Sequence, residues 1–325
     1  MSAKKAPAAT LEFADNKLLR ALGGPHAKHF ARLEQKLNVA IDMRGNLVSI
    51  QGPGPAKDRM RAAAILRALY QRLAAGESIT LAEVDAEIRF TDDARSHAPG
   101  AIKTASSRAV RPRSPAQAAY LEMMRQCPLV FGIGPAGTGK TYLAAAFAAH
   151  MLHEKRVERL ILSRPALEAG ERLGFLPGDL KEKIDPYLRP LYDALFDVLG
   201  EAAGRLMEQG VIEVAPLAFM RGRTLNRAFV ILDEAQNTTP AQIQMALTRL
   251  GEESHMVVTG DPSQSDLPGN KAAGLNQALA ILEGVEGVGI TRFGEQDVVR
   301  HPLVARIVAA YNRADKSADK SSGGS

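Results

Sequence analysis

The amino-acid sequence predicts an α/β protein in which a domain with a parallel sheet follows a smaller α+β unit. Residues 116–312 alternate short apolar runs with helix-forming segments, as parallel sheets with crossover helices do. Residues 10–76 instead place two runs of alternating polarity side by side between helical patterns. With 325 residues, of which 46% are hydrophobic and 24% charged, the chain can bury two cores.

The N-terminal unit is expected over residues 10–90. Its predicted order is strand, helix, glycine-rich turn, helix, strand, strand and helix. Asp15 can cap the first helix, and the alternating runs on both sides of Gly45 indicate a hairpin. One face of the second helix is expected to carry Phe30, Leu33 and Leu37.

The basic residues concentrate in the N-terminal part. Residues 1–113 carry 19 Lys and Arg against 11 Asp and Glu, and the remainder carries 22 against 25. This asymmetry favours a module that faces nucleic acid, although a solvated surface would look the same. Residues 91–113 are expected to form a basic linker that either follows a phosphate backbone or is solvated. The ends, 1–9 and 314–325, are expected to be disordered.

Composition also bears on compartment. No apolar run approaches the roughly 18–20 residues that span a bilayer, so no membrane partner is expected. The first residues lack the apolar stretch of a secretory signal. The single cysteine, Cys127, precludes an intrachain disulfide and is expected to be a packing residue. These features favour the cytoplasm.

The segment 132–141, GIGPAGTGKT, fits two nucleotide-binding patterns. Its glycines match the dinucleotide fingerprint G-x-G-x-x-G, and the same stretch matches the triphosphate-binding P-loop G-x-x-x-x-G-K-T. A dinucleotide site expects an acid after the second strand, where this chain has Arg164, which could still accept an NADP phosphate. That interpretation leaves Lys140 and Thr141 without a role. We therefore interpret the segment as a P-loop.

In a P-loop, backbone N–H groups hold the phosphates, a lysine reaches the β and γ oxygens, and the next hydroxyl binds Mg²⁺. Lys140 and Thr141 fill the last two roles here. The nucleotide is expected to be bound by Gly134, Pro135, Ala136, Gly137, Thr138, Gly139, Lys140 and Thr141.

Two later strand ends complete the predicted site. The apolar run that starts at residue 228 ends in Asp233, which can hold Mg²⁺, and Glu234, which can deprotonate an attacking water. This pair favours hydrolysis of the nucleotide over phosphate transfer to a small molecule, because a small-molecule kinase has no use for an activated water. The run that starts at residue 255 leads to Gln264, which can sense the γ-phosphate.

These segments resemble the PhoH-like ATPase family. The resemblance covers about residues 113–311 and rests on GIGPAGTGKTYLA, SRPALEAGERLGFLPGDLKEKIDPYLRPLYDAL, MRGRTL, ILDEAQNTTPAQ, TGDPSQSDLP and DVVRHPLV. It implies a RecA-like core similar to the first motor domain of superfamily 1 helicases, with ATP and Mg²⁺ as ligands. It makes the DEAQ segment the catalytic motif and Gln264 the phosphate sensor. It also suggests that Gln117 reads adenine, unless Gln117 is merely a helix surface residue.

A helicase completes this site with an arginine from a second motor domain, for which the residues after the last strand leave no room. We therefore expect a neighbouring subunit to supply the arginine in a ring, most plausibly a hexamer. The candidates are Arg300 and Arg164, ahead of Arg189. Surface ion pairs would explain the same residues.

The N-terminal order resembles a KH domain, whose G-x-x-G loop clamps single-stranded RNA. Here the loop contains Gly23 and Gly24, but His26 stands where the G-x-x-G pattern has its second glycine. The loop could therefore serve RNA contact or docking alone. His26 and His29 are expected to be solvated surface residues rather than metal ligands, because no second pair of ligands lies nearby in the sequence. Arg221 and Arg223 could bind RNA phosphates or line a subunit contact. Two functions stay open: an ATP hydrolase coupled to RNA, and an ATP-dependent regulatory switch that does no nucleic-acid work.

Overall fold

The computed structural model describes residues 9–92, 102, 110–165, 180–264, 274–299 and 307. They belong to two compact units, one within residues 1–100 and 111–118 and the other within 101–110 and 119–325. The terminal segments expected to be disordered, apart from Ala9, and most of the expected linker lie outside the described residues.

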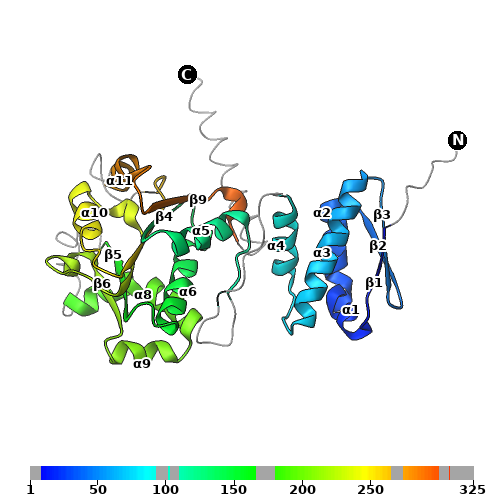
Figure 1. Ribbon diagram of the computed structural model, residues 1–325, viewed down its shortest axis with the longest axis horizontal. Helices are drawn as coiled ribbons and strands as arrows, with labels where there is room; N and C mark the ends of the chain where they lie inside the picture. The colour runs from blue at the N-terminus through cyan, green and yellow to red at the C-terminus, as the bar shows by residue number, and fades with distance from the viewer. Residues whose placement is uncertain are drawn as a thin grey trace, which may run out of the picture. The chain divides into compact units, whose positions relative to one another are not determined.

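The N-terminal unit has the element order that the sequence predicts, with one further helix, α4 (Figure 1). Its three strands form an antiparallel sheet in the order β1-β3-β2. The elements are β1 (Ala9–Glu12), α1 (Asn16–Gly23), the 3-10 turn η1 (Pro25–Ala27), α2 (Lys28–Leu37), β2 (Ala40–Arg44), β3 (Leu47–Gln51), α3 (Ala56–Ala74) and α4 (Leu81–Asp92).

Local chemistry explains where these elements begin and turn. The Asp15 carboxylate accepts hydrogen bonds from the backbone N–H groups of Lys17 (2.6 Å) and Leu18 (3.2 Å), so it caps α1 as predicted. Gly45 has φ 63°, the left-handed conformation that a tight hairpin between β2 and β3 requires.

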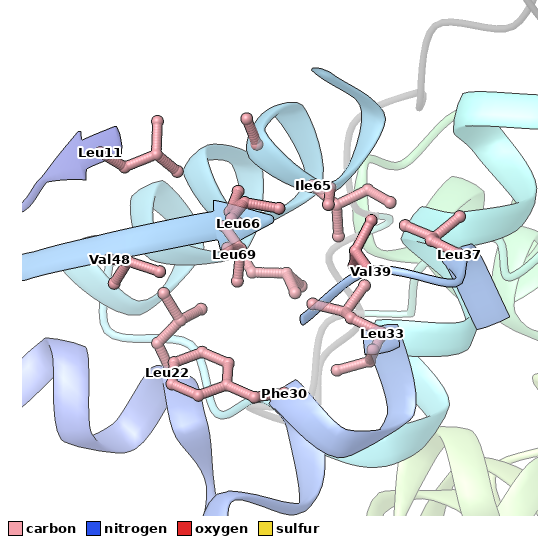
Figure 2. Packing of buried hydrophobic residues seen from close by; sticks show 14 of the residues in the cluster. Leu11, Leu22, Phe30, Leu33, Leu37, Val39, Val48, Ile65, Leu66 and Leu69 are labelled. Carbon is pink, nitrogen blue, oxygen red and sulfur yellow. The ribbon is translucent and has the colours of Figure 1, made fainter. Parts of the chain in front are cut away.

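One apolar core holds the N-terminal unit together. Leu33, Leu66 and Leu69 are fully buried, and Figure 2 shows them gathered in one cluster with other apolar side chains of the unit. The predicted face of α2 is therefore confirmed. His29 corrects the sequence interpretation, which placed it at the solvated surface: it is buried, and its Nδ1 lies 3.0 Å from the Leu22 carbonyl oxygen.

Two arginines of the predicted basic linker are paired with acids of the N-terminal unit. Arg111 forms an ion pair with Glu77, and Arg113 lies 3.7 Å from Glu83 of α4. The sequence had left these arginines either on a phosphate backbone or in solvent. Their charge is instead partly matched within the chain. Glu83 belongs to α4, a helix that sequence patterning did not assign, and Glu77 lies shortly before that helix.

The second unit is a three-layer α/β domain (Figure 1). Its elements are α5 (Pro115–Gln126, shared with the first unit), β4 (Leu129–Ile133), α6 (Lys140–His153), β5 (Arg159–Arg164), α8 (Leu180–Leu199), α9 (Ala202–Glu208), β6 (Ile212–Pro216), η3 (Leu217–Met220), β7 (Ala228–Leu232), η4 (Ala235–Asn237), α10 (Pro240–Leu247), β8 (His255–Gly260), α11 (Gly274–Leu282), β9 (Val288–Arg292) and η6 (Glu295–Asp297).

The six strands that the structure describes in the second unit are all parallel, in the order β6-β5-β7-β8-β4-β9. Helices α6 and α8 contact one another and cover one face, whereas α10 and α11 pack on the other. The central strands are therefore buried on both faces, which is why their sequences are continuously apolar. The edge strand β6 is half-buried, and sequence patterning did not find it.

Candidate functional site

The carboxyl ends of four neighbouring strands meet at one edge of the parallel sheet, where α/β proteins bind ligands. Strand β8 lies between β4 and β7, with Gly132 opposite Thr259 and Leu232 opposite Val258. The residues that follow β4, β7 and β8 therefore come together, although they are far apart in the sequence.

The turn after β4 has the backbone that the P-loop pattern requires. Gly134 has φ 144° and Gly139 has φ 82°, both in the region that favours glycine. A Cβ atom on Gly134 would also collide with the carbonyl oxygen of Phe293, which follows β9. The backbone N–H of Val299 donates to the Gly137 carbonyl at 2.9 Å and so ties the loop to the segment after η6.

Lys140 is the first residue of α6 and its side chain is buried against the loop. Its Nζ donates to the carbonyl oxygens of Gly134 (2.5 Å) and Pro135 (2.9 Å). Burial lowers the pKa of the Lys140 ammonium from its ordinary value, while the nearby carboxylates of Asp261, Asp233 and Glu234 oppose that shift. Phosphate oxygens of a bound nucleotide can replace these two carbonyl oxygens as hydrogen-bond acceptors for the ammonium.

The next residue, Thr141, is joined to the end of β7. Its Oγ1 donates to the Asp233 carboxylate at 2.7 Å, across a separation of 92 residues. Asp233 also accepts a hydrogen bond from Thr259 Oγ1 (2.5 Å), and its backbone N–H donates to the Ser163 carbonyl (2.8 Å). The two residues predicted to hold the metal are thus adjacent, with the Asp233 carboxylate held by Thr259 of β8 and the Asp233 backbone held by β5.

This donor set fits Mg²⁺, which prefers oxygen ligands and takes one or two from the protein beside substrate phosphates. Within the ranges that the structure describes, no group of three or more His, Cys, Asp or Glu side chains could hold a metal alone. Thr141 and Asp233 would therefore share the ion with the nucleotide, as in other P-loop sites.

Glu234 follows Asp233 in a left-handed conformation, with φ 54° and ψ 40°. Such a backbone costs a non-glycine residue about 1–2 kcal/mol, so neighbouring contacts must hold it. The carboxylate lies 3.1 Å from Arg164 Nη2 and also accepts a hydrogen bond from Gln236 Nε2. Glu234, the predicted base, thus lies at the site, where it contacts the side chains of Arg164 and Gln236.

The turn after β8 contains Gln264. The Gln236 Oε1 accepts from the backbone N–H of Asp261 at 3.0 Å, which links the turn to the DEAQ segment. The Asp261 carboxylate accepts from the backbone and hydroxyl of Ser263, so it shapes the turn. Gln264 donates its N–H to the Asp261 carbonyl and is exposed. Its role as a phosphate sensor stays a prediction.

The structure describes Gln117, the predicted adenine-reading residue, but not Arg300, a predicted arginine in trans. Ser114 Oγ accepts from the Gln117 backbone N–H (3.2 Å), and Gln117 Oε1 accepts from the Arg113 backbone N–H (2.6 Å). These contacts give the buried Gln117 a place at the start of α5, and adenine recognition stays a prediction. Arg300 lies outside the described residues, and Arg164 pairs with Glu234 of its own chain.

The predicted RNA-binding residues also have structural partners. Arg223 pairs with both carboxylate oxygens of Glu213, at 2.6 and 2.7 Å, whereas Arg221 is exposed. A Cβ atom on Gly24 would lie 2.7 Å from the His29 ring, and one on Gly23 would lie 3.2 Å from Phe30. Packing therefore explains both glycines without a ligand.

Sequence reasoning missed Thr259 and Arg164 as partners of the two site acids. Thr259 interrupts an apolar strand just before a strand end, and a buried hydroxyl needs a partner. That signal could have identified it. The pairing of Arg164 with Glu234 depends on which strands are neighbours, which the sequence does not state.

This fold and this site define the class of P-loop nucleoside triphosphatases. Residues 109–312 match the sequence model of a family described as PhoH-like protein. The chain is 59% identical over 212 residues to a PhoH-like protein of Bacillus subtilis (strain 168), covering 65% of this chain and 66% of that one. The chain therefore belongs to the PhoH-like family, as the sequence motifs indicate.

Other relatives match over more of the length. A PhoH-like protein of Mycobacterium tuberculosis (strain ATCC 25618 / H37Rv) is 48% identical over 305 residues, covering 92% of this chain and 86% of that one. A PhoH-like protein of Synechocystis sp. is 44% identical over 316 residues, covering 95% and 96%. Among the described helices, none is long and apolar enough to cross a membrane.

Proposed function

We propose that this protein binds ATP with Mg²⁺ at the P-loop and hydrolyses it in the cytoplasm. The observation that carries the proposal is the 2.7 Å hydrogen bond from Thr141 to Asp233, because it joins the P-loop to the strand that ends in Glu234. The residues that we propose to bind phosphate, to hold Mg²⁺ and to accept the proton therefore lie near one another at one edge of the sheet.

The chain's own groups divide the work of hydrolysis. The loop N–H groups and the Lys140 ammonium bind the phosphates and orient the γ-phosphorus. Glu234 accepts a proton from the attacking water while the bond between the γ-phosphorus and the bridging oxygen breaks, which gives ADP and inorganic phosphate. Mg²⁺, when bound beside Thr141 and Asp233, neutralises charge on the phosphate oxygens.

Replacement of Lys140 by Ala tests this assignment. The ammonium is buried against the loop, so its loss removes the only lysine contact that the structure gives the described P-loop residues. We expect nucleotide binding to be lost, as measured by calorimetry with ATP and Mg²⁺, while far-UV circular dichroism stays native. Lys155→Ala, an exposed lysine after α6, is the matched control. Retained ATP affinity in the Lys140 variant would contradict the proposal.

We further propose that hydrolysis is coupled to single-stranded RNA. Support comes from the basic residues 1–113 and from the exposed residues 25–28 after the glycine pair. The element order of the N-terminal unit is also the one expected of a KH-like unit. Aromatic residues make up only 5% of the chain, so binding should rely on phosphates and weaken with salt. ATP turnover measured with and without single-stranded RNA, at several salt concentrations, tests the coupling. Stimulation that fades with salt is the expected result.

The alternative, an ATP-dependent switch without nucleic-acid work, has one observation in its favour. The φ of 70° and the His29 ring favour glycine at position 24, and Gly23 packs closely on Phe30, so the turn needs no RNA to explain it. Absence of both RNA binding and RNA stimulation would support the switch.

We also propose a ring oligomer, most plausibly a hexamer, in which a neighbour supplies an arginine. Because Arg164 is paired with Glu234 of its own chain, Arg300 becomes the leading candidate for the arginine in trans. Sedimentation with ATP tests the ring. A monomer with full turnover would contradict it.

A further inference from the structure

The Glu234 carboxylate is restrained on both oxygens. Oε1 lies 3.1 Å from Arg164 Nη2, and Oε2 accepts from Gln236 Nε2. The backbone beneath is held in a left-handed conformation. Each carboxylate oxygen has two lone pairs, so each can still accept a hydrogen bond from water. The two contacts nevertheless fix the direction in which the carboxylate faces, so a rotation toward the attacking water must weaken one of them.

The two partners differ in how firmly they are held. Gln236 is buried, and its Oε1 is also bound to the backbone N–H of Asp261, so releasing it would disturb the turn after β8. Arg164 is the last residue of β5, and its side chain is 24% exposed. Its other described contact is a hydrogen bond from Nη1 to the Tyr187 carbonyl of α8, at 3.1 Å. Arg164 is therefore the partner that can move away.

We propose that Arg164 is a positioning residue that restrains Glu234 and thereby slows basal ATP turnover. The inference rests on the proposed function, because it assigns Arg164 a role through the catalytic carboxylate. The rotation that turns the carboxylate toward the water weakens the ion pair, so part of the free energy of the pair adds to the barrier. This role differs from an arginine that contacts phosphate, which would accelerate the reaction. The two roles predict opposite effects when the guanidinium is removed.

The test measures kcat and KM at saturating Mg²⁺ for Arg164→Ala. Partly exposed ion pairs contribute up to about 1 kcal/mol, so we expect kcat to rise about two- to fivefold, with KM changed less than twofold. Arg164→Lys keeps a positive charge but loses the forked geometry of the guanidinium, so its kcat should lie between those of the wild type and Arg164→Ala. Arg227→Ala is the matched control, because it removes the exposed Arg227–Glu158 ion pair at the amino end of β7 and should leave kcat unchanged.

Two further measurements separate restraint from a merely structural effect. Salt screens a partly exposed ion pair, so the kcat ratio of Arg164→Ala to wild type should approach one as ionic strength rises. In the Glu234→Gln background, the same substitution should leave single-turnover hydrolysis unchanged, because Arg164 acts through the missing carboxylate.

The outcomes are distinguishable. A tenfold or larger fall in kcat would show that Arg164 acts on phosphate, in its own or a neighbouring site, and would overturn the restraint. An unchanged kcat would overturn it as well. No ATP turnover by the wild-type protein would contradict the proposed function and the inference with it.

Discussion

Gly132 offers the sharpest test of packing near the site, because it belongs to the dinucleotide pattern but not to the P-loop pattern. A Cβ atom at this position would lie 2.7 Å from Cζ and Oη of Tyr120 and 2.8 Å from Cε2. Optimal carbon–carbon contacts are about 3.5–4.0 Å, so the ring would have to move by roughly 1 Å. Tyr120 is fully buried and packs edge-on against Phe293, at 5.3 Å between ring centres, so it has little room to move.

We therefore expect Gly132→Ala to lower the free energy of unfolding by about 1–3 kcal/mol, the usual cost of overpacking a core. Urea unfolding followed by circular dichroism measures this free energy. The transition of the nucleotide-binding unit is the one that ATP and Mg²⁺ shift to a higher urea concentration. Tyr120→Phe should not rescue, because Cζ remains, whereas Tyr120→Leu should reduce the penalty in a double-mutant cycle. An unchanged unfolding midpoint, or a tenfold loss of ATP affinity in a fully stable variant, would refute a pure packing role.

Three more changes have defined outcomes. Thr259→Val removes a hydrogen bond to Asp233, so about 10–100-fold more Mg²⁺ should be needed for half-maximal turnover; an unchanged Mg²⁺ requirement would contradict this. Burial lowers the pKa of His255, so the unfolded chain binds more protons below about pH 6.5 and stability falls as pH drops below that value. His255→Phe, which preserves stacking on Phe229, should flatten that loss in urea unfolding at pH 8 and pH 5.5, and an equal loss in both proteins would count against it. Leu66→Ala should destabilise the N-terminal unit by about 2–5 kcal/mol in urea unfolding, and a loss below 1 kcal/mol would contradict its place in the core.

Local signals in the sequence predicted the strands at the site well. The apolar runs that become β4, β7 and β8 are buried on both faces, and such runs are distinctive. The edge strand β6 escaped notice because one side of it is open and its pattern is mixed. The sequence placed Arg164 at the end of the strand that becomes β5, but it did not predict the pairing of Arg164 with Glu234.

What the sequence lacked was the lateral order of the strands. The pairings of Thr141 with Asp233 and of Arg164 with Glu234 cross 92 and 70 positions of the chain. The second depends on β5 lying beside β7, and the first on β8 alone separating β7 from β4. His29 shows the same limit in the N-terminal unit. A histidine near a turn looks solvated until the packing of α1 against α2 buries it.

The proposed role of Glu234, as the base of an ATP hydrolase built on this P-loop, is tested by replacing one atom group. Glu234→Gln keeps the size of the side chain and removes the carboxylate, so it separates binding from chemistry. We predict that ATP with Mg²⁺ binds with an affinity within about threefold of wild type, while kcat falls by about 10²–10⁴-fold, the usual contribution of a general base. Phosphate release at more than a tenth of the wild-type rate would contradict the claim.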